Sequence, residues 1–148
     1  MDRNTFTEDP PFGCLERSAP PADSHTPEYT LTNFPKNSKN TRAIAHKLYQ
    51  TRRMREQVFS EGLFSDPAWD ILLDLYMAEE EQKKIYITSA CLAAGVPTST
   101  GLRWITILIQ NGYVERHNDP SDARRSFLRL TGTARHALET VLGQLCNG

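Results

Sequence analysis

Arginines and short hydroxyl side chains gather in the second half of this chain, in an arrangement suited to an anionic surface. Residues 97–111 are predicted to form a helix, and at about 100° per residue its polar face carries Ser99, Thr100, Arg103, Thr106, Ile107 and Gln110. Arg103 can donate two hydrogen bonds to a guanine edge, and the hydroxyl groups can reach phosphates or bases. The pattern therefore favours contact with double-stranded DNA, although most polar helix faces merely meet water.

Four further arginines follow in the segment 113–130: Arg116, Arg124, Arg125 and Arg129. The run Asp122-Ala123-Arg124-Arg125 is expected at a hairpin tip, from which a long cationic side chain can enter the narrow minor groove. We expect Asp122 to orient Arg124 by a charge-assisted hydrogen bond. The candidate DNA-binding residues are therefore Thr98, Ser99, Thr100, Arg103, Thr106, Ile107, Asp122, Arg124 and Arg125.

The elements around these residues follow the order of a winged helix-turn-helix. Gly95-Val96-Pro97 predicts the end of a helix over 88–94 and the start of the next, because glycine accepts a left-handed C-terminal position and proline fits a first helical turn. Asn111-Gly112 ends the second helix. Strands over 113–117 and 126–130, joined by the turn-rich run 118–122, make a hairpin wing, and 85–87 is expected to add a third strand. The predicted class is mainly α with a small antiparallel β-hairpin wing (α+β).

Three more helices are expected outside this motif. One begins near residue 40 or 41 and runs to about 60 with a weak apolar stripe, so it is expected to pack partly on its own domain and partly on another subunit. The next is capped by Asp66 with Pro67 at its first position, and it should leave Asp66, Asp70 and Asp74 as one exposed strip. The last covers about 133–145 with a clear apolar stripe, which is core in a monomer and a possible seam in a dimer.

Composition divides the chain into two parts. Residues 1–39 hold six of the nine prolines and no sustained period, so they are predicted to be a disordered tail before a domain over 40–148. The net charge of −1 hides a segregation: residues 62–82 carry six acids and no Lys or Arg, whereas 83–135 carry eight bases against three acids.

Several functional classes have little support. The three cysteines are far apart, no metal-ligand spacing occurs, and the four histidines are scattered with no nucleophile elbow or phosphate-binding glycine loop. We therefore expect no enzyme activity, no cofactor and no metal. The polar N-terminus and the absence of a long apolar run predict a cytoplasmic protein that does not enter the membrane.

Two stretches resemble a known family. The pattern Asp122-x-Arg124-x5-Leu130-Thr131 is similar to the wing signature of MarR-type transcriptional regulators, and Leu108-x3-Gly112-Tyr113-Val114-x-Arg116 is similar to the segment that leads into their wing. The resemblance covers about residues 66–145. It implies a dimeric bacterial repressor or activator whose recognition helix contacts the major groove and whose wing arginine, here Arg124, enters the minor groove. Members usually end in a long helix and a further C-terminal helix, whereas one short helix is expected here.

The sequence thus predicts a sequence-specific DNA-binding transcriptional regulator acting as a homodimer, for which a small-molecule effector is not indicated. The alternative is a winged helix used as a protein-interaction module, which the near-neutral net charge and the expected acidic strip leave open.

Overall fold

The computed structural model describes residues 38–60 and 62–146. In chain order these residues form α1 (Ser38–Val58), α2 (Pro67–Glu80), β1 (Ile85–Tyr86), α3 (Ile87–Ala93), α4 (Thr98–Gln110), β2 (Val114–Asp119), β3 (Asp122–Leu130) and α5 (Gly132–Cys146). The predicted tail, 1–39, lies outside the described residues except for Ser38 and Lys39, with which α1 begins. The predicted class is confirmed: the described residues form a winged helix-turn-helix of five helices and a small antiparallel sheet.

The helix-turn-helix is α3 and α4, and its turn has the expected chemistry. Gly95 has φ +62, in the left-handed region that favours glycine, and α3 and α4 are bent by 106° from each other, as in this class of motif. Gly101 of α4 lies against Cys91 of α3, where an added Cβ would come within 3.1 Å of the Cys91 backbone. Glycine at this position therefore allows the two helices to approach closely.

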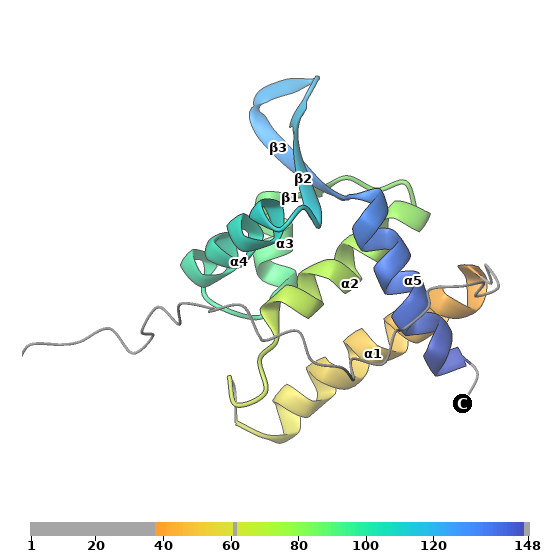
Figure 1. The fold of residues 1–148 in the computed structure, drawn as a ribbon. Coiled ribbons are helices and arrows are strands. Elements are labelled where there is room, and N and C mark those ends of the chain that lie inside the picture. The colour runs from red at the N-terminus through yellow and green to blue at the C-terminus, as the bar shows by residue number, and fades with distance from the viewer. Residues whose placement is uncertain (1–37, 61, 147–148) are drawn as a thin grey trace, which may run out of the picture. The chain divides into compact units, whose positions relative to one another are not determined.

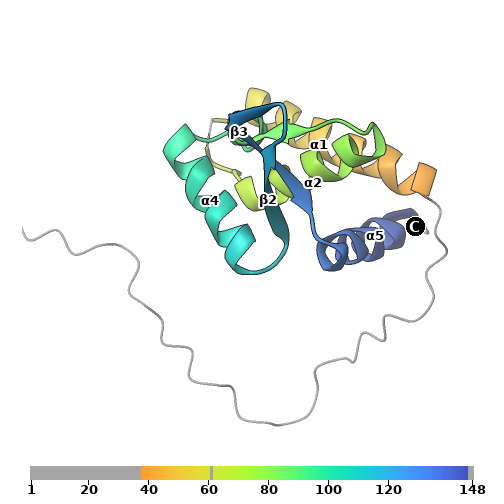
Figure 2. The same ribbon diagram turned by 90° about the horizontal axis from the view of Figure 1, so that it is seen from above.

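The sheet has the order β1-β3-β2, so the predicted third strand is present and β3 is central. Ile85 pairs with Leu128, and Val114 pairs with Leu130 at the base of the hairpin. Thr131 fixes this base, because its hydroxyl donates to the carbonyl of Gly112 at 2.8 Å and accepts from the amide of Ala134 at 3.1 Å. The hairpin of β2 and β3 extends beyond the helices, and α4 and α5 lie to opposite sides of α2 (Figures 1 and 2).

The wing is longer than the sequence indicates. The strands extend to Asp119 and from Asp122, which pair with each other, so only Pro120 and Ser121 lie between them. A register shift falls between Asn118 and Asp119. The predicted turn over 118–122 is therefore too wide.

The core centres on α2, whose Ile71, Leu73 and Leu75 are almost fully buried. Asp66 caps this helix, as predicted, by accepting from the amide of Trp69 at 3.3 Å. The remaining core side chains come from every other helix and from β2 and β3: Ala45, Ala90, Cys91, Ile105, Leu108, Val114, Leu128, Leu130, Ala134, Leu138 and Leu142.

The expected acidic strip on α2 is wrong. Asp66 is exposed, but Asp70 has 0% of its surface exposed and Asp74 is half-buried. Two arginines of α1 cover Asp70, with Arg52 Nε 2.6 Å from Oδ1 and Arg53 Nη2 3.0 Å from Oδ2. An ion pair between two helices thus replaces the exposed carboxylates expected from the helical period.

Among the described residues, no single helix has the length and apolar character needed to cross a membrane. Taken together, α3 and α4 have that length and apolar composition, but the two helices are bent by 106° from each other.

Candidate nucleic-acid interface

The recognition helix α4 carries its predicted polar residues on the solvent side. Thr98, Ser99, Arg103 and Thr106 are exposed, while Thr100 and Ile107 are half-buried. Gly101, Ile105 and Leu108 form the buried side. Leu102 and Ile109 are apolar but 44% and 36% exposed, because the buried arc of α4 is narrower than its apolar arc.

Hydroxyl groups on this helix differ in their freedom to bind. The Thr106 hydroxyl donates to the carbonyl of Leu102 at 2.9 Å, so it faces a ligand chiefly as an acceptor. Ser99 and Thr100 make no such bond with another described residue. The N-terminal half of α4 therefore offers both donors and acceptors, and this half is the part that enters the major groove in helix-turn-helix proteins.

The wing brings three arginines together where it faces the end of β1 and the start of α3. Arg116 of β2, Arg124 and Arg125 of β3 line a depression of about 260 Å³ together with Tyr86, Ile87, Thr88 and Ser126. Arg116 was not among the predicted site residues. Its pairing with Leu128 places it on the same sheet face as Ser126, and this register is known only once the strands are seen to continue to the two-residue turn.

The side chain of Arg124 is not held by Asp122 as predicted. Asp122 Oδ1 instead accepts from the backbone amide of Arg124 at 3.0 Å, which shapes the start of β3 and leaves the guanidinium group free. Arg125 is oriented differently, because its Cζ lies 3.7 Å from the centroid of the Tyr86 ring. Cation–π stacking at this distance aligns Arg125 along the sheet.

Several arginines of this surface have no polar partner. Within residues 38–60 and 62–146, the side chains of Arg103, Arg116 and Arg124 make no hydrogen bond or ion pair. Four arginines of α1 and α5 are instead paired with carboxylates: Arg42 with Glu81, Arg52 and Arg53 with Asp70, and Arg135 with Glu79. The recognition helix and the wing therefore carry arginines that no carboxylate neutralises.

Asp119 fixes the turn of the wing, a role that the sequence did not reveal. Its carboxylate accepts from Tyr86 Oη at 2.5 Å, Ser121 Oγ at 2.7 Å, the Ser121 amide at 3.0 Å and Lys84 Nζ at 3.3 Å. Hydrogen bonds from Tyr86 and Ser121 hold the pKa of Asp119 well below its usual range. The same contact raises the pKa of Tyr86. The turn is thus tied to β1 by a charged group.

His117 has a packing role within the sheet. Its ring stacks on Phe127 with centroids 5.4 Å apart, and Nε2 lies 3.2 Å from Glu115 Oε2. Among the described residues, no cluster of three or more His, Cys, Asp or Glu side chains is arranged to hold a metal ion.

No protein-family model matches the sequence, and neither does any curated protein. Solved structures that resemble the fold include MarR-family regulators. MepR of S. aureus in its DNA-binding conformation is 20% identical, with a TM-score of 0.48 over 74% of this chain and 78% of that one.

Two further solved structures show the range of this likeness. The PcaV transcriptional regulator of Streptomyces coelicolor, in complex with its natural ligand, is 24% identical, with a TM-score of 0.42 over 70% of this chain and 72% of that one. AF1382 of Archaeoglobus fulgidus is 20% identical, with a TM-score of 0.48 over 62% of this chain and 92% of that one. Identities and scores this low do not transfer a function, so the proposal below rests on the residues of this chain.

Proposed function

We propose that this chain is a sequence-specific DNA-binding transcriptional regulator of the MarR type, acting in the cytoplasm as a homodimer. The observation that carries the proposal is the set of unpaired arginines on α4 and the wing. Phosphates attract such groups because every neutralised phosphate releases a condensed counterion. Arg103 is assigned to a base edge in the major groove, and Arg124 to the minor groove.

The depression lined by Arg116, Arg124 and Arg125 refines this assignment. Its three arginines and the hydroxyl groups of Thr88 and Ser126 are suited to a backbone phosphate between the two grooves. Arg116 then contributes to affinity rather than to sequence choice. The alternative of a protein-interaction module loses its main support, because Asp70 is buried and no continuous acidic strip exists on α2.

The dimer proposal rests on apolar surface at the end of α5. Val141 and Leu145 are 47% and 52% exposed, whereas Leu138 and Leu142 of the same helix are in the core. A two-fold dimer through this surface would present two recognition helices to successive major grooves. The binding site should then be an inverted repeat with half-site centres about 10 base pairs apart.

The test begins with duplexes selected from a random DNA pool, whose affinity for the full chain is measured by fluorescence anisotropy at several salt concentrations. The three arginines of the wing, Arg116, Arg124 and Arg125, predict a slope of log K against log salt of about −2.7 per protomer, at about 0.9 for each neutralised phosphate; Arg103, assigned to a base edge, is not counted. Arg124→Ala and Arg116→Ala should each reduce the magnitude of that slope by about one and weaken all duplexes alike. Arg103→Ala should cost about 1–3 kcal/mol, chiefly at one base pair.

Arg42→Ala is the matched control, because it removes the same charge from α1, where Arg42 is paired with Glu81. Its salt slope should equal that of the unmodified protein. Unchanged affinity in both Arg103→Ala and Arg124→Ala would contradict the proposed interface, and salt-independent binding would contradict DNA binding altogether.

A further inference from the structure

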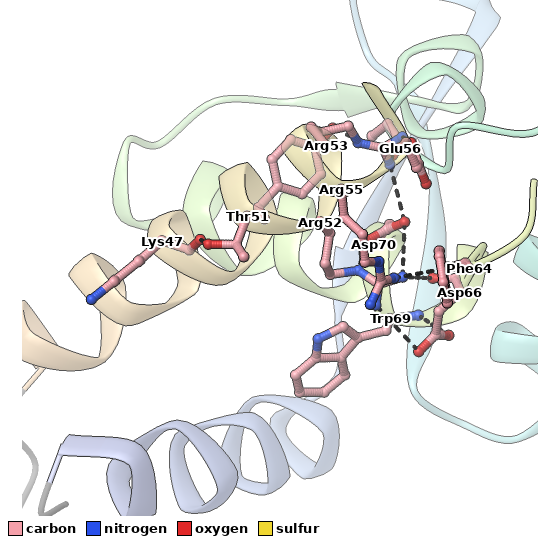
Figure 3. A network of polar contacts seen from close by, with 12 residues as sticks. Lys47, Thr51, Arg52, Arg53, Arg55, Glu56, Phe64, Asp66, Trp69 and Asp70 are labelled. Atoms are coloured by element: carbon pink, nitrogen blue, oxygen red, sulfur yellow. Dashed lines mark hydrogen bonds and ion pairs between the residues drawn. The ribbon is translucent and has the colours of Figure 1, made fainter. Parts of the chain in front are cut away.

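The guanidinium group of Arg53 joins three helices (Figure 3). Arg53 belongs to α1, and its Nη2 donates to Asp70 Oδ2 of α2 at 3.0 Å and to the carbonyl of Ala93 of α3 at 2.5 Å. Its Nη1 donates to Glu56 Oε2 at 2.8 Å, one turn further along α1. A single planar group therefore links the N-terminal helix to the helix-turn-helix.

The carbonyl that Arg53 reaches is at a special position. Ala93 is the last residue of α3, and the last four carbonyls of a helix have no partner within that helix. Here the side-chain partners both come from α1, because Tyr49 Oη also donates to this oxygen, at 3.3 Å. The Tyr49 ring in turn lies 5.1 Å from Arg53 Cζ. Two adjacent turns of α1 thus cap the C-terminal end of α3.

The turn itself packs on the same group. A Cβ atom at Gly95 would overlap Arg53 Nη1 and lie 2.9 Å from Arg53 Cζ. Glycine at this position therefore serves two purposes: it adopts a positive φ, and it lets the turn approach the guanidinium plane. Since α4 begins at Thr98, the contact is separated from the recognition helix by only two residues.

The neighbouring arginine provides an internal comparison. Arg52 also binds Asp70, through Nε to Oδ1 at 2.6 Å and Nη2 to Oδ2 at 3.3 Å, and its Nη2 reaches the carbonyl of Asp66 at 3.4 Å. All of these partners belong to α2 or its cap. Arg52 therefore ties α1 to α2, whereas Arg53 ties α1 to α2 and to the helix-turn-helix.

We infer that Arg53 is a positioning residue for the recognition helix: by capping α3 and supporting the turn, it fixes the direction in which α4 leaves the domain. Its planar fork directs donors from separate nitrogens at acceptors on different helices in a fixed geometry, whereas the donors of a lysine all lie on one nitrogen. This inference rests on the proposed DNA-binding function, and the geometry that carries it is independent of DNA.

The first test compares Arg53→Met with Arg52→Met in the full chain. Hydrogen exchange is measured for the backbone amides of Ala94, Gly95 and Gly101, which donate to the carbonyls of Ala90, Leu92 and Pro97, without DNA and at a temperature where both variants are folded. Arg53→Met should accelerate exchange at these amides about tenfold, as expected for the loss of one charge-assisted hydrogen bond. Arg52→Met should change it less than about twofold, although both variants lower the thermal midpoint.

Affinity for a selected duplex is measured on the same variants. Arg53→Met should weaken binding about fivefold, within the range found for residues that act through a neighbouring element, and Arg52→Met should leave it unchanged. Equal exchange at the turn in both variants would overturn the inference, and so would faster exchange with unaltered DNA affinity. If the unmodified chain does not bind DNA, the proposed function fails while the exchange result still decides the role of Arg53 in holding the turn.

A double-mutant cycle tests the contact with Gly95. Gly95→Ala imposes the same cost of positive φ whether or not Arg53 is present, but it meets the guanidinium group only when Arg53 is present. Gly95→Ala should therefore accelerate exchange at the Gly101 amide, which donates to the Pro97 carbonyl, several-fold more in the unmodified background than in Arg53→Ala. If each substitution changes the exchange rate by the same factor whether or not the other is present, the turn does not pack on Arg53 and the inference is overturned.

Discussion

Replacement of Asp70 by asparagine tests the most buried charge of the described structure. The Asp70 carboxylate is fully buried and accepts from Arg52 Nε at 2.6 Å, Arg53 Nη2 at 3.0 Å and Arg52 Nη2 at 3.3 Å. Asn has nearly the same shape, but it is neutral and its amide nitrogen cannot accept. One end of the side chain would therefore place a donor against a guanidinium group, and both arginines would lose their buried counter-charge while keeping the more exposed Glu56 and Asp66.

The expected loss follows from the burial of the partners. Removing one member of a buried ion pair costs about 3–5 kcal/mol, because the charge left behind is uncompensated. The side chains of Arg52 and Arg53 are 14% and 25% exposed, so both can recover some hydration. We therefore expect the lower end, about 3 kcal/mol of unfolding free energy. For a domain of this size that corresponds to a fall of about 12 °C in the thermal midpoint.

Asp74→Asn is the matched control on the same helix, one turn further on. Burial raises the pKa of Asp74, so its ionisation favours the unfolded chain at neutral pH. Removing that charge should leave the thermal midpoint unchanged or raise it slightly. Both variants are followed by circular dichroism at 222 nm during thermal unfolding. A fall of less than about 3 °C for Asp70→Asn, or equal shifts in the two variants, would refute the assignment of a stabilising ion pair between α1 and α2.

Three further outcomes are expected. The depressed pKa of Asp119 means that its contribution to stability is present above the unfolded-state pKa of about 3.9 and is lost only at lower pH; its carboxyl ¹³C resonance should not titrate between about pH 7 and 4, and a midpoint within that range would contradict the closed wing turn. If the chain forms the proposed dimer, Val141→Glu and Leu145→Glu should convert it to a monomer in light scattering with unchanged circular dichroism, whereas a dimer mass in both variants would place the interface elsewhere. Cys91 is 3% exposed and burial raises its pKa, so its peptide should escape alkylation in the native protein and react after denaturation; equal labelling in both states would contradict its place in the core.

Local signals were sufficient to predict the order of the elements. Asp66-Pro67, Gly95 and Asn111-Gly112 act through their own backbone preferences, so the ends of α2, α3 and α4 lie within one or two residues of the prediction. The polar face of α4 followed from one helical period for the same reason. Its residues on the DNA side remain predictions, since their contacts depend on a ligand.

The wing turn was misjudged because its geometry is decided at a distance. Asn-Asp-Pro-Ser-Asp has the composition of a loop. In the folded chain, Asp119 accepts from Tyr86 and Lys84, which precede it by more than thirty residues, and the strands continue to the two-residue turn. Arg116 was missed for the same reason, since its face of the sheet depends on this register.

The structure also divides the apolar stripe of α5, which was expected to be core in a monomer and a possible seam in a dimer. Leu138 is 3% exposed, so a charge there would disrupt the core rather than a seam. Part of the apolar stripe of α5 is buried in the core and part is exposed, and the helical period alone does not tell which residues belong to each part. Val141 and Leu145 are the residues that remain available for a partner.

The weak apolar stripe of α1 and the burial of Asp70 have a common explanation. A helix with few apolar contacts can still be held on a domain if its cations find buried or partly buried acceptors, and α1 does so through Arg42, Arg52 and Arg53. These arginines are already engaged in ion pairs and are therefore not free to bind phosphates. Arg103, Arg116 and Arg124 form no ion pair among the described residues, and under the proposed function they are the arginines that bind DNA. Charge counts along the sequence treat the two groups alike, and only the pairing of each arginine in the folded chain separates the cations that hold the fold from those offered to a partner.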